Sequence, residues 1–273
     1  MESQPLISVV IPAHNEERGI QRMLDSLIAQ TYPNMQILLV DDGSTDQTLE
    51  LAREYAERDT RITVLPQPCA GVSAARNRAL PLCEGKYIRF VDADDTLPPD
   101  SMEKLVNRAE RDQADLVIAG YTEYVRNLVR YKNLEDREDT LSCHEMLKLL
   151  NPHANSYFYG VLWNKLFLRE PVQAGGIRFE ERLHWGEDFV FVVNYLQTAE
   201  TVAFMKDAVY DYRRTRNSAT IRQVVDSVAH PMKNIRIKRM LYANLKKLYV
   251  ARGEYPAYRS SLWLYLFRFG LDL

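Results

Sequence analysis

The sequence has few cysteines, and their placement excludes two kinds of small, cross-linked domain. Cys69, Cys83 and Cys143 are odd in number, widely spaced and form no C-x-x-C pair. Neither a disulfide framework nor a structural zinc site is expected from such a set. A reducing, cytoplasmic environment fits this use of cysteine best.

Long hydrophobic runs are also lacking. No uncharged apolar stretch approaches the roughly 20 residues that a transmembrane helix requires. Residues 1–5 carry no basic flank followed by an apolar region, so we expect no signal peptide. We therefore predict a cytoplasmic protein that is not integral to the membrane, while peripheral attachment at the inner face stays open.

An excess of positive charge is missing as well. The chain has 35 Lys and Arg against 37 Asp and Glu, for a net charge of -2 with mixed signs. Nucleic acid is therefore not an expected partner. No G-x-G-x-x-G follows an expected strand and no G-x-x-x-x-G-K-[ST] occurs, which argues against dinucleotide-dependent oxidoreductases and P-loop enzymes.

What the sequence does contain is a regular alternation of short apolar runs and amphipathic stretches. Such alternation over residues 1–120 predicts an α/β fold with a mostly parallel central sheet flanked by helices. The expected strands are residues 6–12, 36–41, 62–65, 87–91 and 115–121, and the expected helices are residues 16–29, 72–82, 99–111 and one capped by Asp46. A chain of 273 residues, of which 46% are hydrophobic, is large enough and apolar enough to form such a core.

Polar residues follow three of these strands. Ligands bind beyond the carboxyl ends of strands in open parallel sheets, so these positions are candidate contacts. They are Ala13, His14, Asn15 and Glu16 after the first strand, Asp41, Asp42 and Gly43 after the second, and Asp92, Ala93, Asp94 and Asp95 after the fourth.

The densest of these groups is Asp92, Asp94 and Asp95. Carboxylates crowded in this way repel one another unless a cation relieves the repulsion, and Mg²⁺ or Mn²⁺ completes its shell with phosphate oxygens and water. The cluster is therefore suited to a diphosphate. An acidic turn that caps the helix near residue 99 is the alternative interpretation.

The other polar groups are weaker signals by themselves. Asp42 can accept hydrogen bonds from a base or a ribose, His14 can stack on a nucleobase, and Arg76 can pair with a phosphate. Each also has an ordinary structural interpretation as a loop, a solvent-facing histidine or a surface ion pair.

Together these segments resemble the inverting family 2 glycosyltransferases of the GT-A fold, which bind nucleotides on a Rossmann-like sheet. The matching segments are residues 7–16, 41–46, 71–77 and 84–95, with a looser likeness through residues 163–166, 176–179, 186–191 and 210–213. The motifs occur in the family's order and spacing. The family usually has asparagine at the position of Cys69 and glycine at that of Ala79.

The resemblance implies a function and a site. It implies a metal-dependent glycosyltransferase of the hexosyltransferase class that takes a UDP-sugar and glycosylates a glycan or lipid-linked acceptor in polysaccharide synthesis. Asp42 would hold the base, and Asp188 would be the general base with Glu187 beside it. Mn²⁺ or Mg²⁺ would be held by two of Asp92, Asp94 and Asp95. The implied nucleotide-sugar contacts are Pro12, Ala13, His14, Asn15, Glu16, Asp41, Asp42, Arg76, Asp92, Ala93 and Asp94.

The resemblance also divides the chain. Residues 1–120 would bind the nucleotide sugar, residues 121–220 would form the acceptor-binding and catalytic half of the same domain, and residues 221–273 would be a helical extension. In the extension, helices are expected at residues 225–250 and 255–273. Their basic and apolar side chains leave open a membrane surface, a homodimer or packing on the catalytic domain.

Several alternatives remain open from the sequence. A catalytically idle carbohydrate- or partner-binding module would keep the fold without needing Asp94 and Asp188, and Glu187 and Asp188 would then merely begin a helix. A sugar-nucleotide pyrophosphorylase would need a glycine-rich basic loop after the first strand, which residues 12–16 do not supply. Lys165 and Arg213 are candidate diphosphate or acceptor contacts, and Phe158, Tyr159, Trp163 and Trp185 are either an acceptor platform or core.

Overall fold

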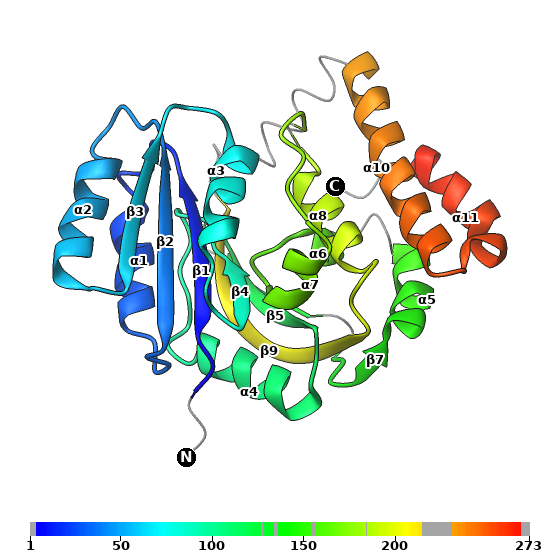
Figure 1. The fold of residues 1–273 in the computed structure, drawn as a ribbon, viewed down its shortest axis with the longest axis horizontal. Helices are drawn as coiled ribbons and strands as arrows, with labels where there is room; N and C mark the ends of the chain where they lie inside the picture. The colour runs from blue at the N-terminus through cyan, green and yellow to red at the C-terminus, as the bar shows by residue number, and fades with distance from the viewer. Residues whose placement is uncertain are drawn as a thin grey trace.

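The computed structural model describes residues 4–126, 128–133, 136–153, 157–183, 185–214 and 231–268. Within them the chain forms a nine-stranded sheet with helices packed around it (Figure 1). The strands are β1 (Ile7–Ala13), β2 (Met35–Asp42), β3 (Ile62–Gln67), β4 (Tyr87–Phe90), β5 (Leu116–Val125), β6 (Leu128–Lys132), β7 (Thr140–Ser142), β8 (Lys165–Leu168) and β9 (Thr201–Arg214). Their order is β3-β2-β1-β4-β8-β5-β9-β7, and β6 pairs with the second half of β5.

The sheet is mostly parallel, as predicted. The first four strands pair in parallel, and β5 pairs in parallel with β9. Because β8 is antiparallel to both β4 and β5, these two strands run in the same direction. The ends of β1, β2 and β4 therefore meet at one edge of the sheet, where ligands bind in such folds.

Helix α1 packs on its neighbours through one apolar stripe. In α1 the buried residues Ile20, Met23, Leu24 and Leu27 recur at spacings of three and four, so one face packs inward. The helices are α1 (Ile20–Ile28), α2 (Thr48–Arg58), α3 (Val72–Ala79), the 3₁₀ turn η1 (Leu80–Leu82), α4 (Ser101–Asp112), α5 (Cys143–His153), α6 (Tyr157–Gly160), α7 (Arg169–Ala174), α8 (Glu187–Tyr195), α10 (Pro231–Ala251) and α11 (Tyr255–Arg268).

The second half of the sheet differs from a simple alternation. The apolar runs at residues 201–205 and 208–212 suggest two short strands, but β9 is one continuous strand whose register against β5 shifts next to Gly120. A Cβ at Gly120 would lie 2.4 Å from the Lys206 carbonyl oxygen, so only glycine permits this close approach of two backbones.

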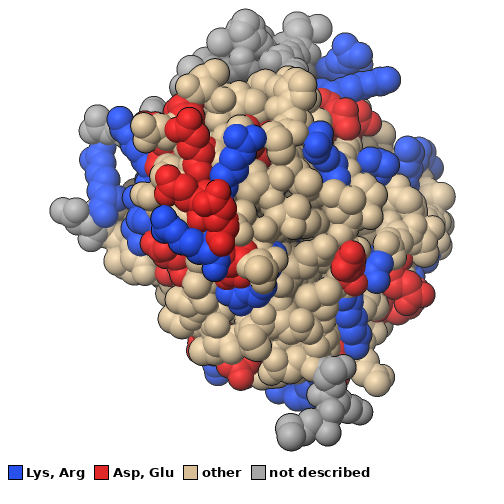
Figure 2. Space-filling view, turned by 60° about the vertical axis from the view of Figure 1, so that its left-hand side comes forward, with Lys and Arg blue, Asp and Glu red and all other residues tan. Residues whose placement is uncertain are grey.

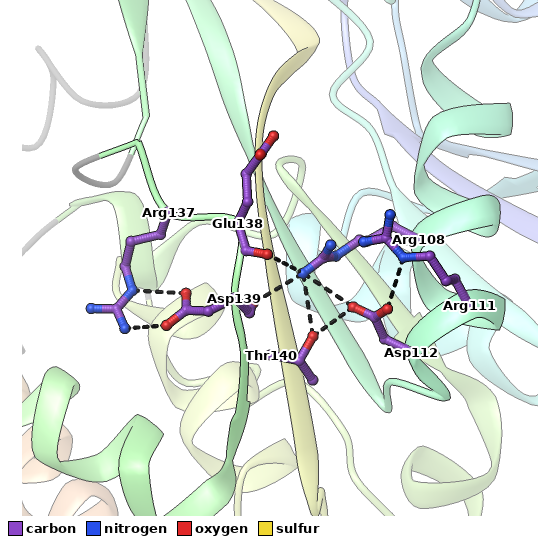
Figure 3. Close-up of polar contacts among 7 residues, drawn as sticks. All are labelled: Arg108, Arg111, Asp112, Arg137, Glu138, Asp139 and Thr140. Carbon is purple, nitrogen blue, oxygen red and sulfur yellow. Dashed lines mark hydrogen bonds and ion pairs between the residues drawn. The ribbon is translucent and has the colours of Figure 1, made fainter.

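The edge strand β7 is tied to the end of α4 (Figure 3). Arg108 donates to the carbonyl oxygens of Glu138 and Asp139 at 2.7 and 3.1 Å and to the Thr140 hydroxyl at 3.2 Å. Asp112 completes the network, since it accepts from Thr140 at 2.5 Å and lies 3.1 Å from Arg108. This short strand therefore gains support that its few ladder bonds do not supply.

The C-terminal extension forms the predicted helix pair, with one correction to its inward stripe. The spacing of apolar residues in 225–250 puts Ile235 in the apolar stripe, but Ile235 is 44% exposed, and Ile237 is buried instead. Leu241, Leu245, Leu248 and Tyr249 of α10 are also buried. The expected start at Val225 and the boundary at residue 220 lie outside the described residues. Among the residues that the structure describes, no helix is both long and apolar enough to span a bilayer.

Candidate active site

Arg76 brings together acidic residues from distant parts of the sequence. It lies in α3 with a side chain that is 4% exposed. Its Nη1 donates to Asp188 Oδ1 at 2.6 Å and its Nη2 to Asp92 Oδ1 at 3.2 Å, while Glu187 lies 3.7 Å away. The guanidinium also lies over the ring of Phe179, 5.3 Å from its centroid. The end of β4 and the start of α8 are thus joined by one cation.

The charges around Arg76 are coupled. Burial disfavours its charge, but Asp188, Asp92 and Glu187 together raise its pKa above the ordinary value, so it stays protonated. Burial also raises the pKa of Asp188, and Arg76 opposes that rise while Glu187 and Asp92 add to it. Asp188 is therefore a carboxylate in a partly dry setting whose ionised form depends on one arginine.

The loop after β4 holds Asp92, Asp94 and Asp95 in different environments. The Asp92 side chain is 34% exposed, and burial, followed by the charge of Asp92, raises the pKa of Asp94 to about 6. Asp95 is 1% exposed and accepts hydrogen bonds from the Tyr210 hydroxyl at 2.8 Å and the Arg213 backbone N–H at 2.7 Å. Asp95 thus fastens the loop to β9, and the Asp92 backbone N–H donates to Tyr210 as well.

Gly19 shapes the same loop from the other side. It precedes α1, and a Cβ placed on it would lie 2.8 Å from the Asp94 Cα and 3.0 Å from the Ala93 carbonyl oxygen. A side chain there would collide with backbone, which cannot move aside without shifting the loop. Gly19 was not singled out from the sequence, because nothing local marks a glycine as a contact to residues 75 positions away.

The turn after β2 is built around Asp42. Its carboxylate accepts from the backbone N–H groups of Ala70 and Gly71, each at 2.8 Å, and from Gln67 Nε2 at 2.7 Å. Its carbonyl oxygen lies 2.7 Å from His14 Nδ1. Asp42 therefore positions the loop that leads into α3 and towards Arg76.

The turns after β1 and β2 are also joined to each other. Asn15 donates its backbone N–H to the Ser44 hydroxyl at 3.0 Å, and its side-chain oxygen accepts from the Thr45 N–H at 2.8 Å. Asn15 adopts a positive φ of 56°, which asparagine tolerates better than most residues. Glu16 donates its N–H to Thr48 at 2.7 Å. Residues 12–16 and 41–46 thus form one surface at the sheet edge.

Asp46 supports the start of α2 as the sequence indicated, although it lies one residue before the N-cap position, which is Gln47. It accepts from the Thr48 backbone N–H at 3.0 Å and from the Thr48 hydroxyl at 2.6 Å, at the first residue of α2. Asp41 is buried and accepts from the Ser44 N–H at 3.3 Å.

Several suggested contacts belong to the core instead. Lys165 is fully buried, and its Nζ donates to the Val161 carbonyl at 2.6 Å and the Phe158 carbonyl at 3.0 Å, so it cannot meet a diphosphate. Phe158, Tyr159 and Trp163 are all buried, so they belong to the core and not to an acceptor platform. Trp185 is partly exposed. Trp163 stacks on Tyr210 with centroids 4.6 Å apart.

Asn77 is a structural residue of the site that the sequence argument used only as part of a motif. Its side chain donates to the Phe179 carbonyl and to Glu181, both at 2.9 Å, and accepts from the Phe179 N–H at 2.8 Å. It thereby clamps the segment before α8 onto α3. Only an alignment of related sequences would have shown that this buried amide bridges more than 100 positions.

The donor set of the loop after β4 fits a divalent cation. Asp92 and Asp94 offer hard carboxylate oxygens, and burial together with the charge of Asp92 raises the pKa of Asp94. A cation would relieve the repulsion between these two carboxylates. Within the part of the chain that the structure describes, the one set of three ligand atoms within 4.8 Å is His14, Asp42 and Cys69, a different place. Any ion at Asp92 and Asp94 would thus need oxygens from a ligand or water.

Comparison with known proteins decides the family. The model of glycosyl transferase family 2 matches residues 8–179, which is more than half of the chain.

The chain belongs to glycosyltransferase family 2.

Curated relatives agree with this assignment. The chain is 33% identical over 226 residues to the uncharacterized glycosyltransferase EpsJ of Bacillus subtilis, covering 79% of this chain and 63% of EpsJ. It is 31% identical over 212 residues to the cholesterol galactosyltransferase of Borreliella burgdorferi, covering 75% of this chain and 59% of that protein. The chain thus spans less than two thirds of the length of these relatives.

Solved structures show the same GT-A fold. S. aureus TarS 1-349 in complex with UDP-GlcNAc superposes with a TM-score of 0.71 at 22% identity, covering 87% of this chain and 66% of that chain. The mannosyltransferase PcManGT of Pyrobaculum calidifontis, in complex with GDP-Man and Mn²⁺, gives 0.62 at 18% identity, covering 97% and 86%. The family and fold predicted from the motifs are confirmed.

Proposed function

We propose that this family 2 glycosyltransferase moves a sugar from a UDP-sugar to a hydroxyl of a glycan or lipid-linked acceptor, with inversion, on the cytoplasmic side of the membrane. The observation that carries the proposal is the pair of hydrogen bonds from Arg76 to Asp92 and Asp188. They support the proposal because one arginine links the carboxylate proposed as general base to a carboxylate proposed for the diphosphate site.

The donor would lie across the ends of β1, β2 and β4. Asp41 and Asp42 end β2 and Asp92 follows β4, and both strands are neighbours of β1. Asp42 would accept a hydrogen bond from the uracil base, with residues 12–16 lining the same surface. The complex of the TarS structure with UDP-GlcNAc supports a UDP-linked donor.

Asp92 and Asp94 would hold Mn²⁺ or Mg²⁺ together with the diphosphate. The bound ion would supply Lewis-acid neutralisation of the charge that develops on the leaving diphosphate. We do not assign this role to Asp95, because it is 1% exposed and holds the loop to β9 through Tyr210 and Arg213. The Mn²⁺ complex of PcManGT supports a divalent cation.

Asp188 would take the proton of the acceptor hydroxyl as the new bond forms. A carboxylate whose pKa is raised towards neutrality is better matched to this task than one at the ordinary value. Arg76 would hold the carboxylate in one orientation and keep it ionised, and Glu187 would add negative charge on the same side. A single displacement of this kind inverts the anomeric centre.

A panel of nucleotide sugars tests the proposal. We expect UDP release from one or more UDP-sugars when Mn²⁺ is present and no release after chelation with EDTA. Undiminished release in EDTA would contradict metal dependence. Binding of a nucleotide sugar with no release, in the presence of acceptor glycans and lipid-linked sugars, would indicate the catalytically idle module instead.

A further inference from the structure

We propose that the outward faces of α10 and α11 bind an anionic lipid surface. This inference goes beyond sugar transfer and does not depend on it. The helix pair forms one side of the molecule, next to α8 (Figure 1). The described residues of these helices offer basic and apolar side chains to solvent, and both kinds would contribute to lipid binding.

The charge of the helix pair differs from that of the whole chain. Residues 231–268 contain nine Lys and Arg and a single acidic residue, Glu254, whereas the whole chain has 35 basic and 37 acidic residues. Glu254 itself pairs with His144. On the face shown in Figure 2, by contrast, acidic and basic side chains are intermixed. The helix pair is therefore a local positive region on a chain with little net charge.

The basic residues of α10 lie on its outward face. Arg236, Arg239, Lys246 and Lys247 are exposed, whereas Ile237, Leu241, Leu245 and Leu248 face the core. Lys246 and Lys247 have no carboxylate partner among the described residues, and Lys246 instead lies over the ring of Tyr255 at 5.0 Å. Each basic residue near a negatively charged bilayer contributes favourably to binding.

Large apolar side chains accompany these charges. Ile235 and Val250 on α10 are 44% and 55% exposed, and Trp263 and Leu264 on α11 are 55% and 42% exposed. Tryptophan and leucine beside lysine and arginine are typical of helices that lie in a membrane interface. A positively charged face fits an anionic bilayer better than a second copy of itself, because two such faces repel each other.

The same surface contains an open hollow of about 540 Å³, whose lining includes Tyr242, Lys246, Lys247 and Val250. Two lysines thus lie beside exposed apolar surface, a combination that suits the interface of an anionic bilayer.

The helix pair lies close to the candidate active site. A Cβ on Gly186 would lie 3.0 Å from Leu241 Cδ2, so α10 packs directly on the residue that precedes Glu187 and Asp188. A bilayer bound to the outward face of α10 would therefore lie one helix diameter, roughly 10 Å, from the start of α8, which carries the candidate base. Such a position suits an acceptor that is itself anchored in the membrane.

Vesicle flotation without any sugar donor tests the proposal. We expect the parent chain to float with vesicles of phosphatidylcholine and phosphatidylglycerol and not with phosphatidylcholine alone. Removing two charges with Lys246→Gln and Lys247→Gln should weaken partition roughly 30-fold, from about fivefold for each basic residue. Trp263→Ser should weaken partition even at high salt, because its contribution is apolar.

The matched control removes two exposed arginines from α2, with Arg53→Gln and Arg58→Gln. This variant should float like the parent. The comparison distinguishes an effect of the outward face of α10 from an effect of net charge. All four substituted basic residues are exposed, so folding is preserved and a melting curve checks it.

Three results would overturn the proposal. Equal flotation with both kinds of vesicle would show that binding does not require anionic lipid. Equal flotation of the lysine variant and the parent would show that the lysines of α10 do not contribute to binding. Absence of flotation together with a dimer that Trp263→Ser dissociates would assign the surface to a second copy. None of these results bears on sugar transfer, which the assay does not use.

Discussion

At the scale of single residues, Arg76 determines how the candidate active site works. A buried arginine with three carboxylates around it stays charged, and removal of any one carboxylate changes the ionisation of the others. The sequence left open whether this arginine pairs with a phosphate or forms a surface ion pair. The structure shows a buried arginine that pairs with Asp92 and Asp188, so any interaction with a diphosphate would compete with existing ion pairs.

Replacement of Asp188 by asparagine tests the proposed base. The amide keeps a carbonyl oxygen that can accept from Arg76 but cannot take a proton at neutral pH. We expect Asp188→Asn to bind a UDP-sugar with nearly the parental affinity and to transfer sugar about 10²- to 10⁴-fold more slowly. Calorimetry measures the first quantity and an initial-rate assay the second.

Glu187→Gln is the matched control, because Glu187 lies beside Asp188 but 3.7 Å from Arg76 rather than 2.6 Å. We expect a smaller loss of rate in this variant. A parental rate in Asp188→Asn, or a larger loss in Glu187→Gln, would contradict the assignment of the base.

The pH dependence of transfer follows from the same environment. Burial raises the pKa of Asp188 above the ordinary value of 3.8, and a general base works only when ionised. Activity should therefore be complete above this raised pKa and should fall as the pH drops through it, at a higher pH than an ordinary aspartate would give. A profile of kcat/KM against pH measures this limb. The same limb, unchanged in the residual activity of Asp188→Asn, would exclude Asp188 as its source.

At the scale of elements, the site depends on how helices and loops meet the ends of strands. Gly19 permits the start of α1 to lie against Ala93 and Asp94, while Asn77 joins α3 to the segment before α8. We propose that neither residue takes part in the reaction and that both fix the distances between the proposed catalytic and metal-binding groups.

Gly19→Ala tests the first of these contacts. The added methyl group would meet backbone at 2.8 and 3.0 Å, so the loop that carries Asp94 must shift. We expect destabilisation of about 1–3 kcal/mol and a loss of transfer activity of up to roughly 100-fold. Thermal melting and the rate assay measure the two effects.

Gly160→Ala is the control for this prediction. A Cβ there would lie 3.6 Å from Phe189 Cβ, which is an ordinary contact, so the stability and the rate should stay close to parental values. Equal effects of the two substitutions would show that the contact between Gly19 and the loop has no special role.

The elements that the sequence predicted well are those with strong local patterns. The strands β1, β2 and β3 and helices α1 and α4 carry clear periodicity, so they appear close to the expected positions. By contrast, β8 is a four-residue strand that forms only because β4 and β5 present two open edges. Its location depends on pairing with distant strands, which no local pattern reveals.

The candidate site shows the same division. The carboxylates after β2 and β4 could be predicted to lie at one edge, because parallel strands bring their ends together. The burial of Asp95 could not be predicted, since its hydrogen-bond partners Tyr210 and Arg213 lie about 120 residues away in the sequence. The burial of Lys165 could not be predicted either, since it depends on α6, a short helix with no clear sequence pattern.

At the scale of the whole molecule, the sheet and its helices would hold the donor while α10 and α11 hold the lipid surface. The two proposals can be tested separately, because α10 contacts the site through its inward face and would bind lipid through its outward face. The central claim is that Asp92 and Asp94 hold a cation and a nucleotide sugar jointly.

Thermal unfolding of the parent chain with Mn²⁺ and a UDP-sugar tests this claim most directly. At a UDP-sugar concentration 100 times its Kd, we predict that the parent chain is stabilised by about 2.7 kcal/mol, which raises its Tm by roughly 5–10 °C. This stabilisation should disappear with EDTA and in Asp94→Asn. An equal rise in Tm in the presence of EDTA, or in Asp94→Asn, would contradict it.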